Sequence, residues 1–361
     1  MSSNIKIGQK LNQRLESIDG LRGIAAFLVV IGHYFTAFYG FNKVKLDLLT
    51  YKSYQILFPF SDIGFSLFFI ISGFLIFATI EKNSAKKFVV NRFSRLFPTY
   101  WLCVVLTTIV IYFLDENRNS IVQFFGNLTM FQRFLGIKHI DGVYWTLEVE
   151  LIFYFSVLLI KSISSSSKIT ISFLFIILFS ILSHLFFKSG FISNISNIIT
   201  TNQNSGILIL LSKELKHFAV FFDSYLPFFF IGIIIHELRQ KRISNYFFYF
   251  CLIIVFWLIY LEHTRTLFIV SFGNIALFVL ALCKYNKFFT TKIFKFLGKV
   301  SYPLYLFHQK IGYLVILFLL SFGINLLLAK ILMIAIALLI ASWISTNIEL
   351  NFMYKLRKIF K

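Results

Sequence analysis

Ionisable side chains interrupt an apolar stretch near the start of the chain. The segment IDGLRGIAAFLVVIGHYF (18–35) contains Asp19, Arg22 and His33. On a helix, Arg22 and His33 point the same way, about 16 Å apart along the axis, and Asp19 can pair with Arg22 at i and i+3. Because an ionisable group in lipid costs several kcal/mol, we expect His33 to face a bundle interior, where an imidazole can act as a general base. The alternatives are a charged helix anchor and a purely structural histidine.

Two carboxylates begin a second apolar segment, GVYWTLEVELIFYF (142–155). Glu148 and Glu150 are separated by about 200° on a helix, so they cannot both face one cavity. Glu150 is expected about 10 Å from the membrane edge, close to the depth expected for His33. Glu150 and His33 are therefore candidates for a base and the group that orients it. A structural carboxylate is the alternative interpretation, and Glu148 stays open as the supporting residue.

Two arginines and a group of small residues could bind an activated donor. Arg92 and Arg95 are at i and i+3, and paired guanidinium groups hold phosphate well; a positive membrane anchor is the alternative interpretation. Ser72 and Gly73 belong to DIGFSLFFIISGFLI (62–76), where small residues indicate close helix packing or space for a ligand.

A polar stripe runs through the apolar segment LGKVSYPLYLFHQKIGY (297–313). Its members are Ser301, Tyr305, His308 and Gly312. Their spacing of i, i+4, i+7 and i+11 places them on one helix face, which should point into the protein. Pro303 is expected in the first helical turn, where proline is tolerated. His308 is a second candidate for proton transfer or donor binding, and a structural stripe is the alternative.

The elements that position these residues are membrane-spanning helices. Hydrophobic residues make up 58% of the 361 residues and charged residues 14%, far from a soluble domain. Apolar runs of about 18 residues indicate transmembrane helices. We predict an all-α polytopic helical bundle with about ten spans, at 21–41, 56–80, 97–114, 143–161, 169–187, 218–237, 246–261, 266–283, 301–321 and 325–347.

The net charge of +20 reflects topology. With both termini placed in the cytoplasm, 23 Lys and Arg residues lie in inside segments and 10 in outside loops, as the positive-inside rule requires. The basic charge therefore does not indicate nucleic-acid binding. The three cysteines have no metal-site or disulfide spacing, and we expect no metal. The main outer loops are expected at 40–58, 115–142 and 188–217.

These motifs together resemble the acyltransferase-3 family of multispan membrane O-acyltransferases. The matching blocks are Asp19-Gly20-Leu21-Arg22-Gly23 with His33, Phe68-Phe69-Ile70-Ile71-Ser72-Gly73-Phe74, Arg92-x-x-Arg95, Trp145-Thr146-Leu147-x-Val149-Glu150-x-x-Phe153-Tyr154, and Leu297-Gly298-x-x-Ser301-Tyr302-x-x-Tyr305-Leu306-x-His308. The five blocks occur in family order. The chain departs from the family at Leu151, where many members have a second acidic residue, and at the additional Glu148.

The resemblance implies acyl transfer, with acetyl-CoA from the cytoplasm as co-substrate and no tightly bound cofactor. The acceptor would be a hydroxyl of an extracytoplasmic sugar in lipopolysaccharide or another surface polysaccharide, and the location the bacterial inner membrane. We expect a cytoplasmic tail (1–17), an acyltransferase-3-like transmembrane domain (18–350) and a basic cytoplasmic tail (351–361). The oligomeric state stays open.

Within that reaction, His33 is the expected base, with Glu150, Asp19 and Arg22 supporting it. The residues expected to bind the CoA donor are Arg92, Arg95, Ser72, Gly73, Tyr305 and His308. Direct transfer and an acyl-enzyme both remain open. A secondary transporter or flippase for a glycolipid or small anion could also use intramembrane ionisable residues, and a scaffold in a polysaccharide-synthesis complex is a third hypothesis.

Overall fold

The computed structural model describes residues 2–39, 59–163, 166–187, 224–283, 287–349 and 351–352, and the regular structure in these ranges is entirely helical. The all-α fold is therefore confirmed. The helices are α1 (Ser2–Gly32), α4 (Pro59–Lys82), α5 (Ala85–Leu114), α6 (Ile121–Leu128), α7 (Trp145–Ile163), α8 (Ser166–Phe187), α11 (Leu226–Arg239), α12 (Asn245–Glu262), α13 (Arg265–Leu282), α14 (Lys292–Ser321) and α15 (Leu326–Ile344). The short elements are the π-helices η1 (His33–Ala37) and η5 (Ser345–Glu349) and the 3₁₀-helices η2 (Gly142–Tyr144) and η4 (Phe288–Thr290).

Eight described helical segments are long and apolar enough to cross a membrane, which confirms a polytopic membrane protein. They coincide with eight of the ten predicted spans. At the other two positions the described apolar helices are shorter: residues 170–182 within α8, and the 14 residues of α11. Residues 218–223 of the sixth predicted span lie outside the described residues, as do the loops 40–58 and 188–217 and the tail from 353 onwards.

The described chain forms two compact units, and α4, α7 and α13 each contribute to both. Unit 1 contains residues 1–67, 86–148 and 276–361, and unit 2 contains residues 68–85 and 149–275. The following description treats each unit by itself.

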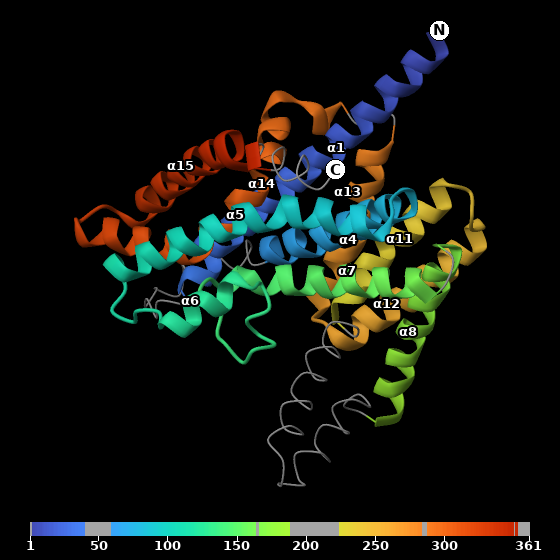
Figure 1. Ribbon diagram of the computed structural model, residues 1–361, viewed down its shortest axis with the longest axis horizontal. Helices are drawn as coiled ribbons and strands as arrows, with labels where there is room; N and C mark the ends of the chain where they lie inside the picture. Colours follow the sequence, from blue (N-terminus) through green and yellow to red (C-terminus); the bar gives the residue numbers. More distant parts are fainter. Residues whose placement is uncertain are drawn as a thin grey trace. The chain divides into compact units, whose positions relative to one another are not determined.

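The core of unit 1 is the contact between α1 and α14, the most extensive between any two described elements, with α15 packed against α14 (Figure 1). Glycine allows the two backbones to approach closely. A methyl group on Gly23 would come within 2.3 Å of the Gly298 nitrogen, and one on Gly298 within 2.4 Å of the Asp19 carbonyl oxygen. Small residues in membrane helices permit this kind of backbone contact.

The beginning of α14 differs from the expectation. Helix α14 starts at Lys292, so Pro303 lies inside the helix and the prediction of a first-turn proline is wrong. Proline has no N–H for the carbonyl four residues earlier, which belongs to Lys299. The Ser345 hydroxyl donates a hydrogen bond to that carbonyl at 3.0 Å. The side chain from η5 thus replaces the missing backbone donor and lets the helix continue through the proline.

Unit 2 is organised around α4 and α11. Gly73 and Gly232 bring the two backbones together: a methyl group on Gly73 would lie 2.0 Å from the Phe229 carbonyl oxygen. The ring of Phe229 stacks on Phe69 of α4 and on Phe153 of α7. At the ends of α4 and α7, the Lys161 ammonium group donates hydrogen bonds to the backbone carbonyls of Ile80 and Asn83.

We expect Gly23→Ala to destabilise the protein strongly, because the added methyl group would push α1 away from α14. Overpacking of this kind costs about 1–3 kcal/mol. Gly273→Ala is the matched control, since a methyl group there would meet no described atom within 4 Å. Thermal unfolding of the two purified variants in detergent measures the difference. Equal melting temperatures would contradict the close α1–α14 contact.

Candidate active site

Two histidines meet at the α1–α14 contact. The Nδ1 atom of His33, the first residue of η1, lies 2.7 Å from the Nε2 atom of His308. The two ring planes are inclined by only 17°. His308 is fully buried, whereas His33 is partly exposed. The structure therefore brings two of the predicted site residues into direct contact, and one of the two, His33, is partly exposed.

The hydrogen bonds of the pair determine which nitrogen is basic. His308 Nδ1 lies 2.8 Å from the Tyr305 carbonyl oxygen, and because a carbonyl can only accept, Nδ1 must carry the proton. In the neutral ring, His308 Nε2 then has a lone pair and accepts a hydrogen bond from His33 Nδ1–H. The remaining nitrogen, His33 Nε2, keeps its own lone pair. Helix α14 thus holds His33 in the tautomer that a general base requires.

Two tyrosines fix the backbones on either side of the histidine pair. The Tyr34 hydroxyl donates to the His308 carbonyl at 2.8 Å, and the Tyr313 hydroxyl donates to the His33 carbonyl at 3.3 Å. Gly312 leaves the space for Tyr34, because a methyl group there would lie 2.2 Å from the Tyr34 hydroxyl oxygen. The π-helical turn at His33 is of a kind found frequently at functional sites.

Nearer its start, α1 also contacts α14 through Arg22. The Arg22 guanidinium group donates to Asp19 at 3.3 Å and to the Ser301 hydroxyl at 3.2 Å. The i and i+3 pair is therefore confirmed, and so is the expectation that Arg22 and His33 share a helix face. Glu349 of η5, which the sequence analysis missed, lies within electrostatic reach of Arg22 and Arg95. No local sequence pattern could have identified it.

The predicted donor-binding residues of unit 1 lie on two helices, α5 and α14. Arg92 and Arg95 are partly buried on α5, and the Arg92 guanidinium group lies 5.5 Å from the centre of the Phe88 ring. Tyr305 shares a hydrogen bond of 2.9 Å with the Thr146 hydroxyl. Among the described residues, no cluster of His, Cys, Asp and Glu has the geometry of a metal site.

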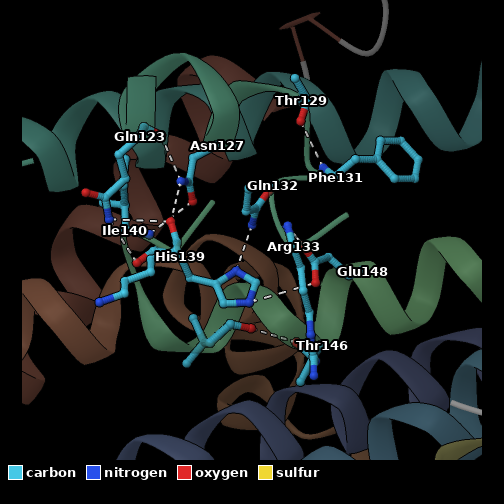
Figure 2. Close-up of polar contacts among 12 residues, drawn as sticks. Gln123, Asn127, Thr129, Phe131, Gln132, Arg133, His139, Ile140, Thr146 and Glu148 are labelled. Carbon is cyan, nitrogen blue, oxygen red and sulfur yellow. Dashed lines mark hydrogen bonds and ion pairs between the residues drawn. The ribbon is translucent and has the colours of Figure 1, made fainter. Parts of the chain in front are cut away.

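The two glutamates of α7 have different partners, as their spacing predicted. Glu148 accepts a hydrogen bond from the Arg133 backbone N–H at 3.0 Å and lies 3.8 Å from His139 Nε2 (Figure 2). His139 Nδ1 is in turn 2.9 Å from the side-chain amide nitrogen of Gln132. Glu148, where the chain departs from the motif, therefore binds the segment that precedes α7.

Glu150 belongs to unit 2. Its carboxylate accepts hydrogen bonds from the Ser72 hydroxyl, at 2.9 Å, and from the Tyr154 hydroxyl. Two predicted site residues, Ser72 and Glu150, are thus bonded to each other. The role of Glu150 beside His33 stays a prediction.

The buried side chain of Asp141 holds the beginning of α7 against α14. It contacts α14 at Lys310, two residues after His308. The carboxylate of Asp141 accepts the backbone N–H groups of Lys310 and Val143, at 2.9 and 3.1 Å. The Lys310 ammonium group donates to Asp115 at 2.6 Å. The sequence analysis missed Asp141, although an aspartate directly before a helix is the usual signal of an N-cap.

Two ionisable groups before α7, the buried Asp141 and the half-buried His139, have pKa values displaced in opposite directions. Burial raises the pKa of Asp141 to about 6, against the opposing effects of the Lys310 and Val143 hydrogen bonds and the Lys310 charge. Burial lowers the pKa of His139 to about 4, and the Arg133 charge acts in the same sense. The folded protein therefore favours the neutral form of both side chains.

This difference predicts opposite pH dependences for two variants. Between pH 4 and 6, folded Asp141 holds a proton that unfolded Asp141 has lost, so its contribution to stability falls as the pH rises. For His139 the contribution falls as the pH drops from 6.5 to 4, because only the unfolded side chain takes up a proton. Each tenfold difference in proton affinity corresponds to about 1.4 kcal/mol.

We therefore expect the melting temperature of Asp141→Asn, relative to the unchanged protein, to increase from pH 4 to pH 6. That of His139→Gln should decrease over the same interval. Thermal unfolding at a series of pH values measures both, and each variant is the control for the other. Parallel curves would show that burial does not displace these two pKa values.

Parts of this chain are similar to known proteins. Nodulation protein 10 of Rhizobium leguminosarum bv. viciae is 31% identical over 116 residues, which cover 26% of this chain and 32% of the relative. A protein of Acidianus two-tailed virus, named as a candidate acetyltransferase, is 26% identical over 152 residues, 42% of each chain. The matches thus span less than half of either relative. No solved structure matches the chain.

A family match covers nearly the whole sequence. Residues 15–346 match the acyltransferase-3 family, described as an acyltransferase domain, and this range includes every site residue predicted from the sequence. The expected family is confirmed, and an acyltransferase is favoured over a transporter, a flippase or a scaffold. With its apolar helices, the chain belongs to the acyltransferase-3 family of multi-pass membrane acyltransferases.

Proposed function

We propose that this protein transfers an acyl group, acetyl in the first instance, from acyl-CoA on the cytoplasmic side to a sugar hydroxyl on the opposite side of the membrane. The observation that carries this proposal is the His33–His308 hydrogen bond of 2.7 Å, which leaves a lone pair on His33 Nε2. A base that is held in one tautomer and is partly accessible suits deprotonation of a hydroxyl.

In the proposed reaction, His33 Nε2 accepts the proton of the acceptor hydroxyl as its oxygen attacks the thioester carbonyl carbon. The new C–O bond forms, the C–S bond breaks, and the CoA sulfur leaves as a thiolate that takes the proton from His33. During the step His33 is positively charged. His308 stabilises that charge because its neutral Nε2 accepts a hydrogen bond from His33 Nδ1–H, while its own Nδ1–H remains bonded to Tyr305.

The donor is proposed to bind through its phosphates to Arg92 and Arg95, whose guanidinium groups match phosphate geometry. Tyr305 is proposed to contact the thioester arm. Arg22 has a positioning role: its bonds to Asp19 and Ser301 fix the register of α1 on α14, and thereby the distance between the two histidines.

The proposed acceptors are hydroxyl groups of lipopolysaccharide or of another surface polysaccharide, and the proposed location is the bacterial inner membrane with both termini in the cytoplasm. The family match and the name of the viral relative support acyl transfer. The acetyl group, the sugar acceptor and acetyl-CoA as co-substrate are parts of the proposal.

We expect His33→Ala to lower acyl transfer from acetyl-CoA by about 10²–10⁴-fold, the usual contribution of a general base. His308→Ala should also lower it, because His33 would lose the acceptor that sets its tautomer. The matched control is His263→Ala, since His263 bonds to the Ser224 carbonyl in unit 2, outside the proposed site. Transfer is measured with purified protein in lipid nanodiscs. Full activity of a folded His33→Ala variant would disprove the proposed base.

We expect the double variant Arg92→Ala and Arg95→Ala to raise the KM for acetyl-CoA about tenfold or more, because each charge-assisted hydrogen bond contributes about 1.5–3 kcal/mol. Lys86→Ala is the control, as it removes an exposed positive charge from the same helix. Steady-state kinetics with varied donor gives both values. A donor KM that changes equally in the double variant and the control would contradict phosphate binding by the arginine pair.

A further inference from the structure

The segment between α5 and α7 folds back along α5. The Tyr100 hydroxyl donates to the Asn127 carbonyl at 2.7 Å, and the Trp101 indole N–H donates to the Leu128 carbonyl at 2.8 Å. Figure 1 shows α6 beside the part of α5 that leads to its end at Leu114. Tyr100 and Trp101 precede that end by about 20 Å along the helix axis.

The charges along α5 indicate which part of it lies in the hydrocarbon layer. Residues 96–114 are uncharged, with Arg95 before them and Asp115 after them. A helix of this length measures about 28 Å, which matches the thickness of the hydrocarbon core. Because Tyr100 and Trp101 lie within this stretch, the carbonyls of Asn127 and Leu128 are held at membrane depth.

The outward face of α6 is apolar. Ile121, Val122 and Phe125 are 76%, 66% and 61% exposed, while Gly126 and Asn127 on the opposite face are buried. Helix α5 carries an exposed apolar stripe that would face lipid in a membrane. Its members are Val105, Ile109, Tyr112 and Phe113. The Arg118 guanidinium group lies 4.4 Å from the centre of the Tyr112 ring, so the chain that enters α6 adjoins this stripe.

Side chains of the segment form hydrogen bonds with several of its backbone polar groups. The Asn127 side chain donates to the carbonyls of Gln123 and Lys138 and accepts from the Ile140 N–H (Figure 2). The Thr129 hydroxyl donates to the Gly126 carbonyl and accepts from the Phe131 N–H. Irregular backbone is tolerated at membrane depth when protein groups or a wet cavity satisfy it.

We propose that residues 121–137 form a re-entrant segment, in which α6 contacts lipid acyl chains through Ile121, Val122 and Phe125. Lipid acyl chains cover the apolar face of α6, because this face adjoins the lipid-facing stripe of α5. The exposed Lys138 lies on the aqueous side of the segment. This assignment differs from the sequence-based expectation that the whole of 115–142 is an outer loop.

Spin labels at single cysteines test the proposal in lipid nanodiscs with the full chain. Cys103 and Cys251 are buried and Cys283 is exposed, so Cys283→Ser provides the background. Labels are placed at Val122→Cys and Phe125→Cys. The reference positions are Ile109→Cys on the lipid-facing stripe of α5, and Asn117→Cys and Lys138→Cys as aqueous positions.

We expect labels at 122 and 125 to collide with oxygen more often than with a water-soluble nickel chelate, as at 109, and the reverse at 117 and 138. An aqueous result at 122 and 125 would overturn the proposal. Low accessibility to both reagents would mean that protein, such as a second copy of the chain, covers α6, and would overturn it equally. A lipid-like label at 138 would contradict the two-sided segment. If the labelled protein with a cysteine at 122 or 125 fails to fold, Ile121→Cys is used as the labelling site instead.

Discussion

The close contact between α1 and α14 is the constraint on which the rest of unit 1 depends. Gly23 and Gly298 bring the two backbones together, and only at that separation can His33 reach His308 with a hydrogen bond of 2.7 Å. Arg22 and Ser301 form a second connection nearer the helix start. The same packing therefore stabilises the membrane domain and assembles the candidate base.

Several polar groups within the membrane domain are bonded to particular partners, because an unsatisfied group costs much more in lipid than in water. The hydroxyl of Tyr34 on a carbonyl of α14 and the Ser345 hydroxyl on the carbonyl left open by Pro303 follow this rule. His308 follows it too, since its Nδ1–H is bonded to a backbone carbonyl. One consequence is chemical: satisfying His308 leaves His33 with an unprotonated nitrogen.

The segment before α7 connects the fold to the proposed chemistry. Asp141 binds the backbone of α14 at Lys310, two residues beyond His308, and Glu148 binds the backbone of the preceding loop at Arg133. The additional carboxylate of the motif thus has a structural partner within this segment. A re-entrant arrangement would place part of this segment at membrane depth, on the side of the protein where the acceptor is proposed to bind.

The sequence by itself determined the membrane-helix class, most span positions, the shared face of Arg22 and His33, and the polar stripe that includes His308, because helical periodicity and apolar length are local properties. Tertiary structure decided which residue contacts which. The pairing of His33 with His308, the partners of the two glutamates of α7, the role of Asp141 and the course of α6 depend on how distant helices pack. The register between α1 and α14 cannot be read from any local spacing, since it is set by backbone and side-chain contacts between residues more than 270 positions apart.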